Sequence, residues 1–192
     1  MKKFLLFLAV LLVIAAGVGG YFIYNYYLGN LDSISKTFTS GNGTYSINTP
    51  ASWREVTPSS QNGVIAAENS SKSMYMMVTV RSKNSSSSSL TSSSAESIED
   101  YVGKYIQDIA ANSDDPIVQM MTVPPKQSKI GENSGYYFEL DTVSNSMPIH
   151  TWDFVIDTDK GFVHVDVTAP GEDTVIAADT AIGIISSLVI KE

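Results

Sequence analysis

Between Gly135 and Ala169, apolar and polar residues alternate in three consecutive runs. A period of two places successive side chains on opposite faces of a β-sheet. The positions assigned to one face are aromatic or branched: Tyr136, Phe138, Leu140, Trp152, Phe154, Ile156, Val163, Val165 and Val167. The other face is assigned Asp141, Asp153, His164 and Asp166. The pattern therefore predicts a three-stranded antiparallel meander with one apolar and one acidic face.

Two flanking segments have helical periodicity and are predicted to cover this sheet. The first follows a capping-box pattern at Ser93 to Glu96 and is expected to end near Asn112. Its apolar stripe consists of Ile98, Tyr101, Val102, Tyr105, Ile106 and Ile109. The stripe of the second helix consists of Val175, Ala178, Ile182, Ile185 and Leu188. The pattern predicts an α+β fold in which helices cover an antiparallel sheet.

Further strands are predicted on either side of the first helix. Those before it are Tyr45–Asn48, Val64–Glu68 and Met74–Arg81, and the one after it is Ile117–Val123. The last of these is expected to break at Pro124-Pro125, because proline has no N–H to donate to a neighbouring strand.

The N-terminal segment is predicted to anchor the chain in a membrane. Phe4 to Tyr24 contains no charged residue, and a helix of that length spans about 31 Å, close to the thickness of a hydrocarbon core. Lys2 and Lys3 favour a cytoplasmic N-terminus and an extracytoplasmic C-terminal domain on a single-pass protein. The alternative is a cleaved signal peptide and a secreted protein. The predicted domains are an anchor or signal at 1–27, a flexible tether at 28–43 and a folded domain at 44–192.

Composition excludes several classes of site and partner. The chain has a formal net charge of −8 and no cysteine, which excludes disulfides, thiolate metal sites and cysteine nucleophiles. Its acidity disfavours binding to nucleic acid. Residues 82–94 are rich in serine and are predicted to form a low-complexity loop.

The two ends of the folded region carry a pattern that resembles the PsbP-like family. The opening motif is Tyr45-Ser46-Ile47-x-x-Pro50-x-x-Trp53, and the closing motif is Asp179-x-Ala181-x-x-Ile184-Ile185-x-Ser187-Leu188. The resemblance implies an α/β/α sandwich, with a central antiparallel sheet between two main helices, and a mostly non-enzymatic accessory role. It brings no functional residues with it. We assign structural roles to Tyr45, Pro50, Trp53, Trp152 and Ser187.

Few residues in the sequence suggest a catalytic or metal-binding site. His150 and His164 are the only histidines, and no nucleophile elbow, zinc-binding helix or phosphate-binding loop is present. We therefore expect neither enzymatic activity nor a cofactor. Asp153, His164 and Asp166, with Asp141, are candidate ligands of a divalent cation, because carboxylates and imidazole bind such ions. The alternative is that these side chains form the solvated side of the sheet.

The register between the last two strands of the meander determines which of these polar residues lie opposite each other. If Asp157 to Lys160 form the loop, Phe154 lies opposite Val163 and Asp153 lies opposite His164. The next register that keeps the same faces sets Asp153 against Asp166, which would favour a bound cation between them. We predict the first register.

These features predict a membrane-tethered extracytoplasmic domain with an accessory or protein-binding role at the cell envelope. The expected partners are the membrane, through the N-terminal helix, and an envelope protein. The alternative is an envelope domain that binds a small molecule or a divalent metal. A hydrolase is a third hypothesis, and it requires a serine within hydrogen-bond reach of a histidine.

Overall fold

The computed structural model describes residues 34–83, 97–111, 121–144, 146–171 and 174–191. The predicted anchor at 4–24 and most of the serine-rich loop lie outside these ranges. Within them, neither helix combines the length and the apolar character that crossing a membrane requires.

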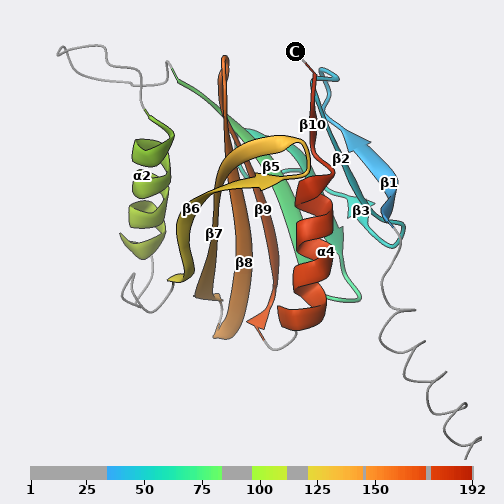
Figure 1. The fold of residues 1–192 in the computed structure, drawn as a ribbon. Helices are drawn as coiled ribbons and strands as arrows, with labels where there is room; N and C mark the ends of the chain where they lie inside the picture. The colour runs from blue at the N-terminus through green and yellow to red at the C-terminus, as the bar shows by residue number, and fades with distance from the viewer. Residues whose placement is uncertain (1–33, 84–96, 112–120, 145, 172–173, 192) are drawn as a thin grey trace, which may run out of the picture. The chain divides into compact units, whose positions relative to one another are not determined.

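The described strands form a larger sheet of seven strands and a smaller sheet of three (Figure 1). The larger sheet is antiparallel throughout. Its order is β3 (Arg54–Glu55), β4 (Gly63–Asn69), β5 (Met74–Ser82), β9 (Gly161–Pro170), β8 (Met147–Thr158), β7 (Asn133–Ser144) and β6 (Met121–Ile130). The smaller sheet has the order β1 (Ile34–Thr39), β2 (Tyr45–Pro50) and β10 (Val189–Ile190). The meander predicted from the alternating pattern, β7–β8–β9, is confirmed.

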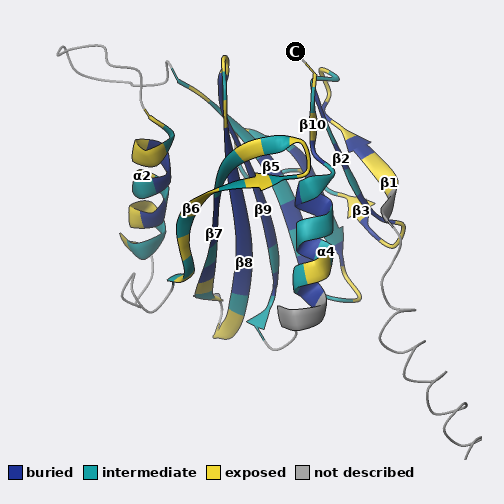
Figure 2. Cartoon of the chain, viewed as in Figure 1, coloured by how far each residue is buried: buried dark blue, intermediate teal, exposed yellow. Residues whose placement is uncertain are grey.

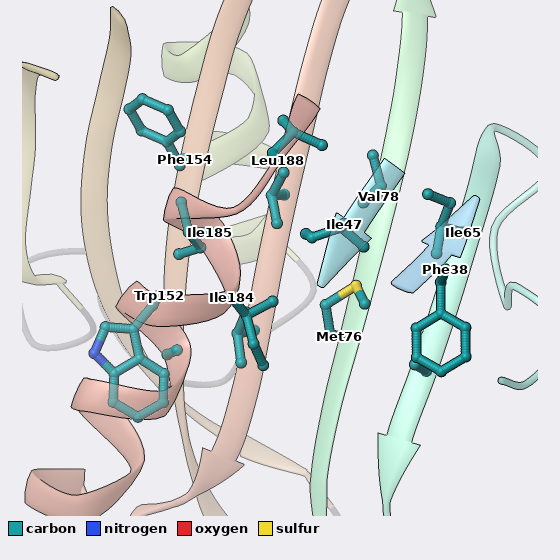
Figure 3. Packing of buried hydrophobic residues seen from close by; sticks show 14 of the residues in the cluster. Phe38, Ile47, Ile65, Met76, Val78, Trp152, Phe154, Ile184, Ile185 and Leu188 are labelled. Atoms are coloured by element: carbon teal, nitrogen blue, oxygen red, sulfur yellow. The ribbon is translucent and has the colours of Figure 1, made fainter. Parts of the chain in front are cut away.

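One face of the larger sheet packs against helix α4 (Thr174–Ser186) and the smaller sheet. Ile184 and Ile185 of α4 are fully buried there, in one cluster with Ile47 of β2. The sheet contributes Met76, Val78, Trp152, Phe154, Val163, Val165 and Val167 to this cluster (Figure 3). Met74 and Met76 of β5 thus fill the core.

The opposite face packs against helix α2 (Ile98–Ala111). The stripe predicted from helical spacing faces the sheet, since Tyr101, Val102 and Ile106 are buried (Figure 2). They form a second cluster with Phe138, Leu140, Val155 and Phe162 of the sheet. The prediction of an antiparallel sheet covered by two helices, in the α+β class, is confirmed.

The residues on each face of the sheet differ from the prediction, because the side chains of β7 point to the faces opposite to those predicted. In the β7–β8 hairpin, Phe138 lies opposite Asp153, and Glu139 lies opposite Trp152. Directly opposed residues share a face. The apolar side chains of β7 therefore lie beneath α2 with Asp153, while Glu139 and Asp141 lie on the α4 side. Both faces need apolar contacts since a helix covers each, so the acidic residues are divided between them.

The prediction that residues 28–43 form a flexible tether is wrong from residue 34 onwards. Residues 34–39 form β1, which pairs with β2 and buries Phe38. The polar composition of this segment is consistent with an edge strand, in which alternate side chains face water.

Strand β6 also differs from the prediction, because it continues through Pro124 and Pro125. The ladder with β7 is irregular between Val123 and Lys126, and β6 lies at the edge of the sheet. At an edge, proline N atoms can face away from the neighbouring strand, so no ladder bond is lost. Helix α2 begins later than predicted: the Ser97 hydroxyl accepts a hydrogen bond from the Asp100 N–H, at 3.1 Å, and thus caps the helix.

The five residues assigned structural roles lie in or beside the α4-side core. Tyr45, Pro50, Trp53 and Trp152 are buried. The Ser187 hydroxyl accepts a hydrogen bond from the Asn48 N–H, at 2.8 Å, and so joins the end of α4 to β2.

The turn between β6 and β7 lies directly over the C-terminal end of α4. Asn133 Nδ2 donates a hydrogen bond to the Leu188 carbonyl, at 2.8 Å. Gly131 has a φ of +60°, and a Cβ there would lie 2.2 Å from the Ser186 carbonyl oxygen. Only glycine fits this contact.

Replacing Gly131 with alanine is expected to lower the free energy of unfolding by about 1–3 kcal/mol, since it adds both a strained φ and a backbone clash. Urea unfolding monitored by circular dichroism measures the change. Gly103→Ala is the matched control: this glycine lies inside α2 with no atom near the added Cβ. It is expected to stabilise the protein by up to about 1 kcal/mol. Equal effects of the two substitutions would contradict the prediction.

Candidate functional site

The register of β8 and β9 sets Asp153 opposite Asp166, and Val155 opposite His164. The predicted pairing of Asp153 with His164 is therefore wrong. The loop is two residues shorter than predicted, because β8 continues to Thr158, which pairs with Gly161. The Thr158 hydroxyl donates to the Gly161 carbonyl, at 2.7 Å, and accepts from its N–H, at 3.1 Å. These bonds favour a two-residue turn at Asp159-Lys160.

Asp153 and His164 nevertheless interact, as diagonal neighbours on the α2 side of the sheet. His164 Nε2 lies 2.7 Å from Asp153 Oδ1. The Tyr105 hydroxyl, from α2, donates to the same oxygen at 3.3 Å. Asp153 is completely buried and His164 is 2% exposed. A buried carboxylate requires such donors, because it has lost its hydration.

The second oxygen of Asp153 remains unsatisfied. Both donors contact Oδ1, whereas the buried Oδ2 has no hydrogen-bond partner among the described residues. The Asp166 side chain, which is 9% exposed, lies across the strand from it. This centre thus combines two buried carboxyl groups, one imidazole and one phenol.

Burial and the neighbouring charges change the pKa values of these groups. Burial raises the pKa of Asp166 to about 7, against the opposing effect of His164. Burial alone would lower the pKa of His164, but the hydrogen bond and charge of Asp153 and the charge of Asp166 raise it above its ordinary value. Burial and the charge of Asp153 raise the pKa of Tyr105 well above its ordinary value. These directions favour a protonated His164 and a neutral phenol at neutral pH.

Aromatic rings surround the imidazole and separate it from water. The ring centroid of Tyr105 lies 4.5 Å from that of His164, edge to face, and Phe138 lies at 6.3 Å. Tyr101 lies at 6.5 Å and stacks on Phe162. The enclosed environment strengthens the pairing of His164 with Asp153.

A pocket of about 440 Å³ lies beside this centre, between α2 and the sheet. Its walls come from α2, β7, β8 and β9. The lining residues are Tyr105, Asp108, Ile109, Leu140, Thr142, Val143, Thr151, Asp166 and Thr168. Asp166 connects the pocket to the buried centre.

The metal-site hypothesis gains no support from this geometry. Asp153 and Asp166 do face each other, but His164 binds the Asp153 carboxylate directly. Across the described part of the chain, no group of three or more His, Cys, Asp or Glu side chains is arranged to hold a metal ion. Asp141, the fourth candidate, lies on the other face of the sheet.

A second polar cluster, around His150, was not expected from the sequence. Nδ1 of His150 lies 2.6 Å from Asp141 Oδ1, and Nε2 lies 3.1 Å from Glu139 Oε2. Tyr137 also donates to Glu139, and the Trp152 ring lies 4.4 Å from the imidazole. Identifying this cluster required knowing which β7 side chains share a face with β8. Because both imidazole nitrogens contact carboxylates, His150 has none left for a serine.

Comparisons with known proteins identify the fold. No protein-family model and no curated protein sequence matches this chain. Cyanobacterial PsbP (CyanoP) from Synechocystis has a similar structure, with a TM-score of 0.57 and 10% identity over 81% of this chain and 91% of that one. LpqN of Mycobacterium tuberculosis, a protein involved in cell envelope biogenesis, gives a TM-score of 0.50 and 14% identity, over 88% of this chain and 97% of that one.

A protein from Bacteroides thetaiotaomicron gives a TM-score of 0.53 at 14% identity. The matched region covers 82% of this chain but about half of that protein, 49%. At identities this low, the similarities concern the fold alone. They confirm, at that level, the resemblance first suggested by the motifs around Tyr45 and Ser187: this chain has the fold of PsbP-like proteins.

Proposed function

We propose that the protein is a membrane-tethered, extracytoplasmic PsbP-like domain that binds another protein of the cell envelope and has no enzymatic activity. The observation that carries this proposal is the fold shared with CyanoP and with LpqN, the latter a protein of cell envelope biogenesis. The uncharged segment from Phe4 to Tyr24, preceded by Lys2 and Lys3, supports the tether.

A non-enzymatic role is supported by how the histidines are used. Both nitrogens of His150 contact carboxylates, and His164 is only 2% exposed beneath α2. A serine hydrolase needs an imidazole nitrogen directed at a serine hydroxyl.

The end of the β7–β8 hairpin is the place where we expect a protein partner. Val143 is 58% exposed and Met147 is 62% exposed. They flank this turn on adjacent strands, and large apolar side chains grouped at an exposed turn are typical of contact sites.

The full-length chain with a photo-crosslinking amino acid at Met147 should therefore give one discrete adduct in intact cells. The protein and its adduct should both remain in membranes after a carbonate wash. Immunoblotting of the washed membranes measures both results. The matched control carries the same amino acid at Asp159, an exposed turn residue at the other end of β8.

Two outcomes would contradict this proposal. Release of the chain by carbonate would show that it is not anchored. Identical adduct patterns from Met147 and Asp159, or none from either, would contradict binding at the β7–β8 turn. A small-molecule-binding function is the second candidate, and the pocket beside Asp166 favours it.

A further inference from the structure

The pocket beneath α2 has the size and lining of a small-molecule site. Its volume of about 440 Å³ falls within the range of about 300–1,000 Å³ that is usual for such sites. Ile109 and Leu140 supply apolar wall, and Val143, which is exposed, lies at its rim. The polar lining includes Thr151, Thr168, Tyr105 and Asp166.

Asp166 is a buried carboxyl group at the wall of this pocket, and among the described residues its side chain has no hydrogen bond to another side chain. Asp166 is 9% exposed and is one of the residues that line this pocket. Its hydrogen bond within the described structure is to its own backbone. Buried carboxyl groups in proteins are normally paired or multiply hydrogen-bonded. A buried carboxyl group at the wall of a cavity, without a side-chain hydrogen bond among the described residues, points to a ligand that would supply that hydrogen bond.

We infer that this pocket binds a small organic cation, a primary ammonium ion with a compact apolar body, through Asp166. The ammonium group would donate hydrogen bonds to the Asp166 carboxylate and to the hydroxyls of Thr151 and Thr168. The apolar body would lie between Ile109 and Leu140. This inference goes beyond the proposed envelope role and does not depend on it.

The charges around the pocket select for a cation. Asp166 and Asp108 line it, and Asp153 lies directly behind Asp166. Both donors to Asp153 contact Oδ1, and among the described residues its Oδ2 atom has no hydrogen-bond partner. An anion would be repelled by these carboxylates, and the described residues offer no arrangement for a bare metal ion.

Proton release should accompany binding, because an ammonium ion favours the ionised form of Asp166. The pKa of Asp166 is raised to about 7, so part of the population must lose a proton when the cation binds. The surrounding groups are Tyr105 and Asp108 from α2, Asp153 from β8, His164 from β9, and Met77 with the Tyr75 hydroxyl from β5. Affinity for an amine should therefore rise between pH 6 and pH 8.

Benzylamine and benzyl alcohol test this inference, since they differ in charge but hardly in shape. The full-length chain in lipid nanodiscs is titrated by ligand-observed NMR, with empty nanodiscs as the blank. We expect a dissociation constant of about 1 mM or lower for benzylamine, and binding at least about tenfold weaker for benzyl alcohol.

Asp166→Asn keeps the shape of the side chain and should weaken benzylamine binding about tenfold, since a charge-assisted hydrogen bond is lost. It should leave the weak binding of benzyl alcohol unchanged. Asp159→Asn removes the same charge from an exposed turn and should change neither affinity. The inference is overturned if benzylamine does not bind at about 10 mM, if the alcohol binds equally well, or if Asp166→Asn binds benzylamine like the unmodified protein.

Discussion

Replacing His164 with leucine is expected to lower the free energy of unfolding by about 3–5 kcal/mol. The leucine fills a similar volume, so the loss arises from electrostatics. Asp153, which is completely buried, would keep only the Tyr105 hydroxyl, at 3.3 Å, as a donor. Urea unfolding at pH 6, where His164 is protonated in the unmodified protein, measures the loss.

A second substitution separates this explanation from simple loss of packing. Combining His164→Leu with Asp153→Asn removes the buried charge, and most of the lost stability should return. Arg54→Ala is the matched control for an ion pair in water, because Arg54 binds Glu68 at the surface with 69% of its side chain exposed. It should change the free energy of unfolding by less than about 1 kcal/mol. If His164→Leu costs no more than Arg54→Ala, the pairing with Asp153 does not stabilise the fold.

The stability of the protein should fall as the pH rises from about 5 to about 8, by roughly 2–4 kcal/mol. Asp166 titrates at about 7 in the folded protein, against an ordinary value of 3.8. Between these values the folded state holds a proton that the unfolded chain has released, so raising the pH favours unfolding. Urea unfolding across this range measures the slope.

His164 contributes with the same sign. Its folded pKa lies above the ordinary value of 6.5, so its stabilising effect is complete below about 6.5 and is lost as the pH rises through the folded value. Glu68 and Glu99 act in the opposite direction: hydrogen bonds from Arg54 and from Tyr136 lower their pKa values below 4.5. Their effect is confined to more acidic solutions and leaves the range from pH 5 to 8 unaffected.

Asp166→Asn should flatten this profile and make the protein more stable than the unmodified chain at pH 8, because asparagine has no proton to lose. Asp159→Asn, at an exposed turn, should leave the profile unchanged. A profile that stays equally steep in Asp166→Asn would show that another group causes the decline.

Local patterns in the sequence predict much of this fold. The spacing of Ile98, Tyr101 and Ile106 correctly assigns the face that α2 buries, and strict alternation identifies the three strands of the meander. Both patterns depend only on the geometry of one element. The motif around Tyr45 and Pro50 adds the resemblance to the PsbP-like fold, which the structural neighbours share.

The sequence does not determine the register between neighbouring strands or which of their faces coincide. Alternation assigns two faces to each strand but does not say which face of one strand continues into the next. That depends on the length of the turn, and a change of one residue exchanges the faces. For this reason Asp141 lies with His150 instead of His164. Between β8 and β9 the faces are as predicted, but the two-residue turn after Thr158 shifts the pairing by two residues and brings Asp153 opposite Asp166.

The pocket could not be predicted for a similar reason. Its residues come from α2 and three strands, and Asp108 and Thr168 line one pocket only once the helix is docked. Asp166 was a candidate from the sequence because of its residue type, whereas its burial at the wall of this pocket is a property of the folded chain.

The pairing of β2 with both β1 and β10 affects when the domain can finish folding. The hydrogen bond between Asn48 and Ser187 joins residues 139 positions apart, and Val189 pairs with Ser46. A chain emerging from a ribosome or a membrane channel cannot make these contacts until residues 187–190 have emerged. Such long sequence separation slows folding. If the chain is exported, as we propose, closure of the smaller sheet is deferred until β10 has crossed the membrane.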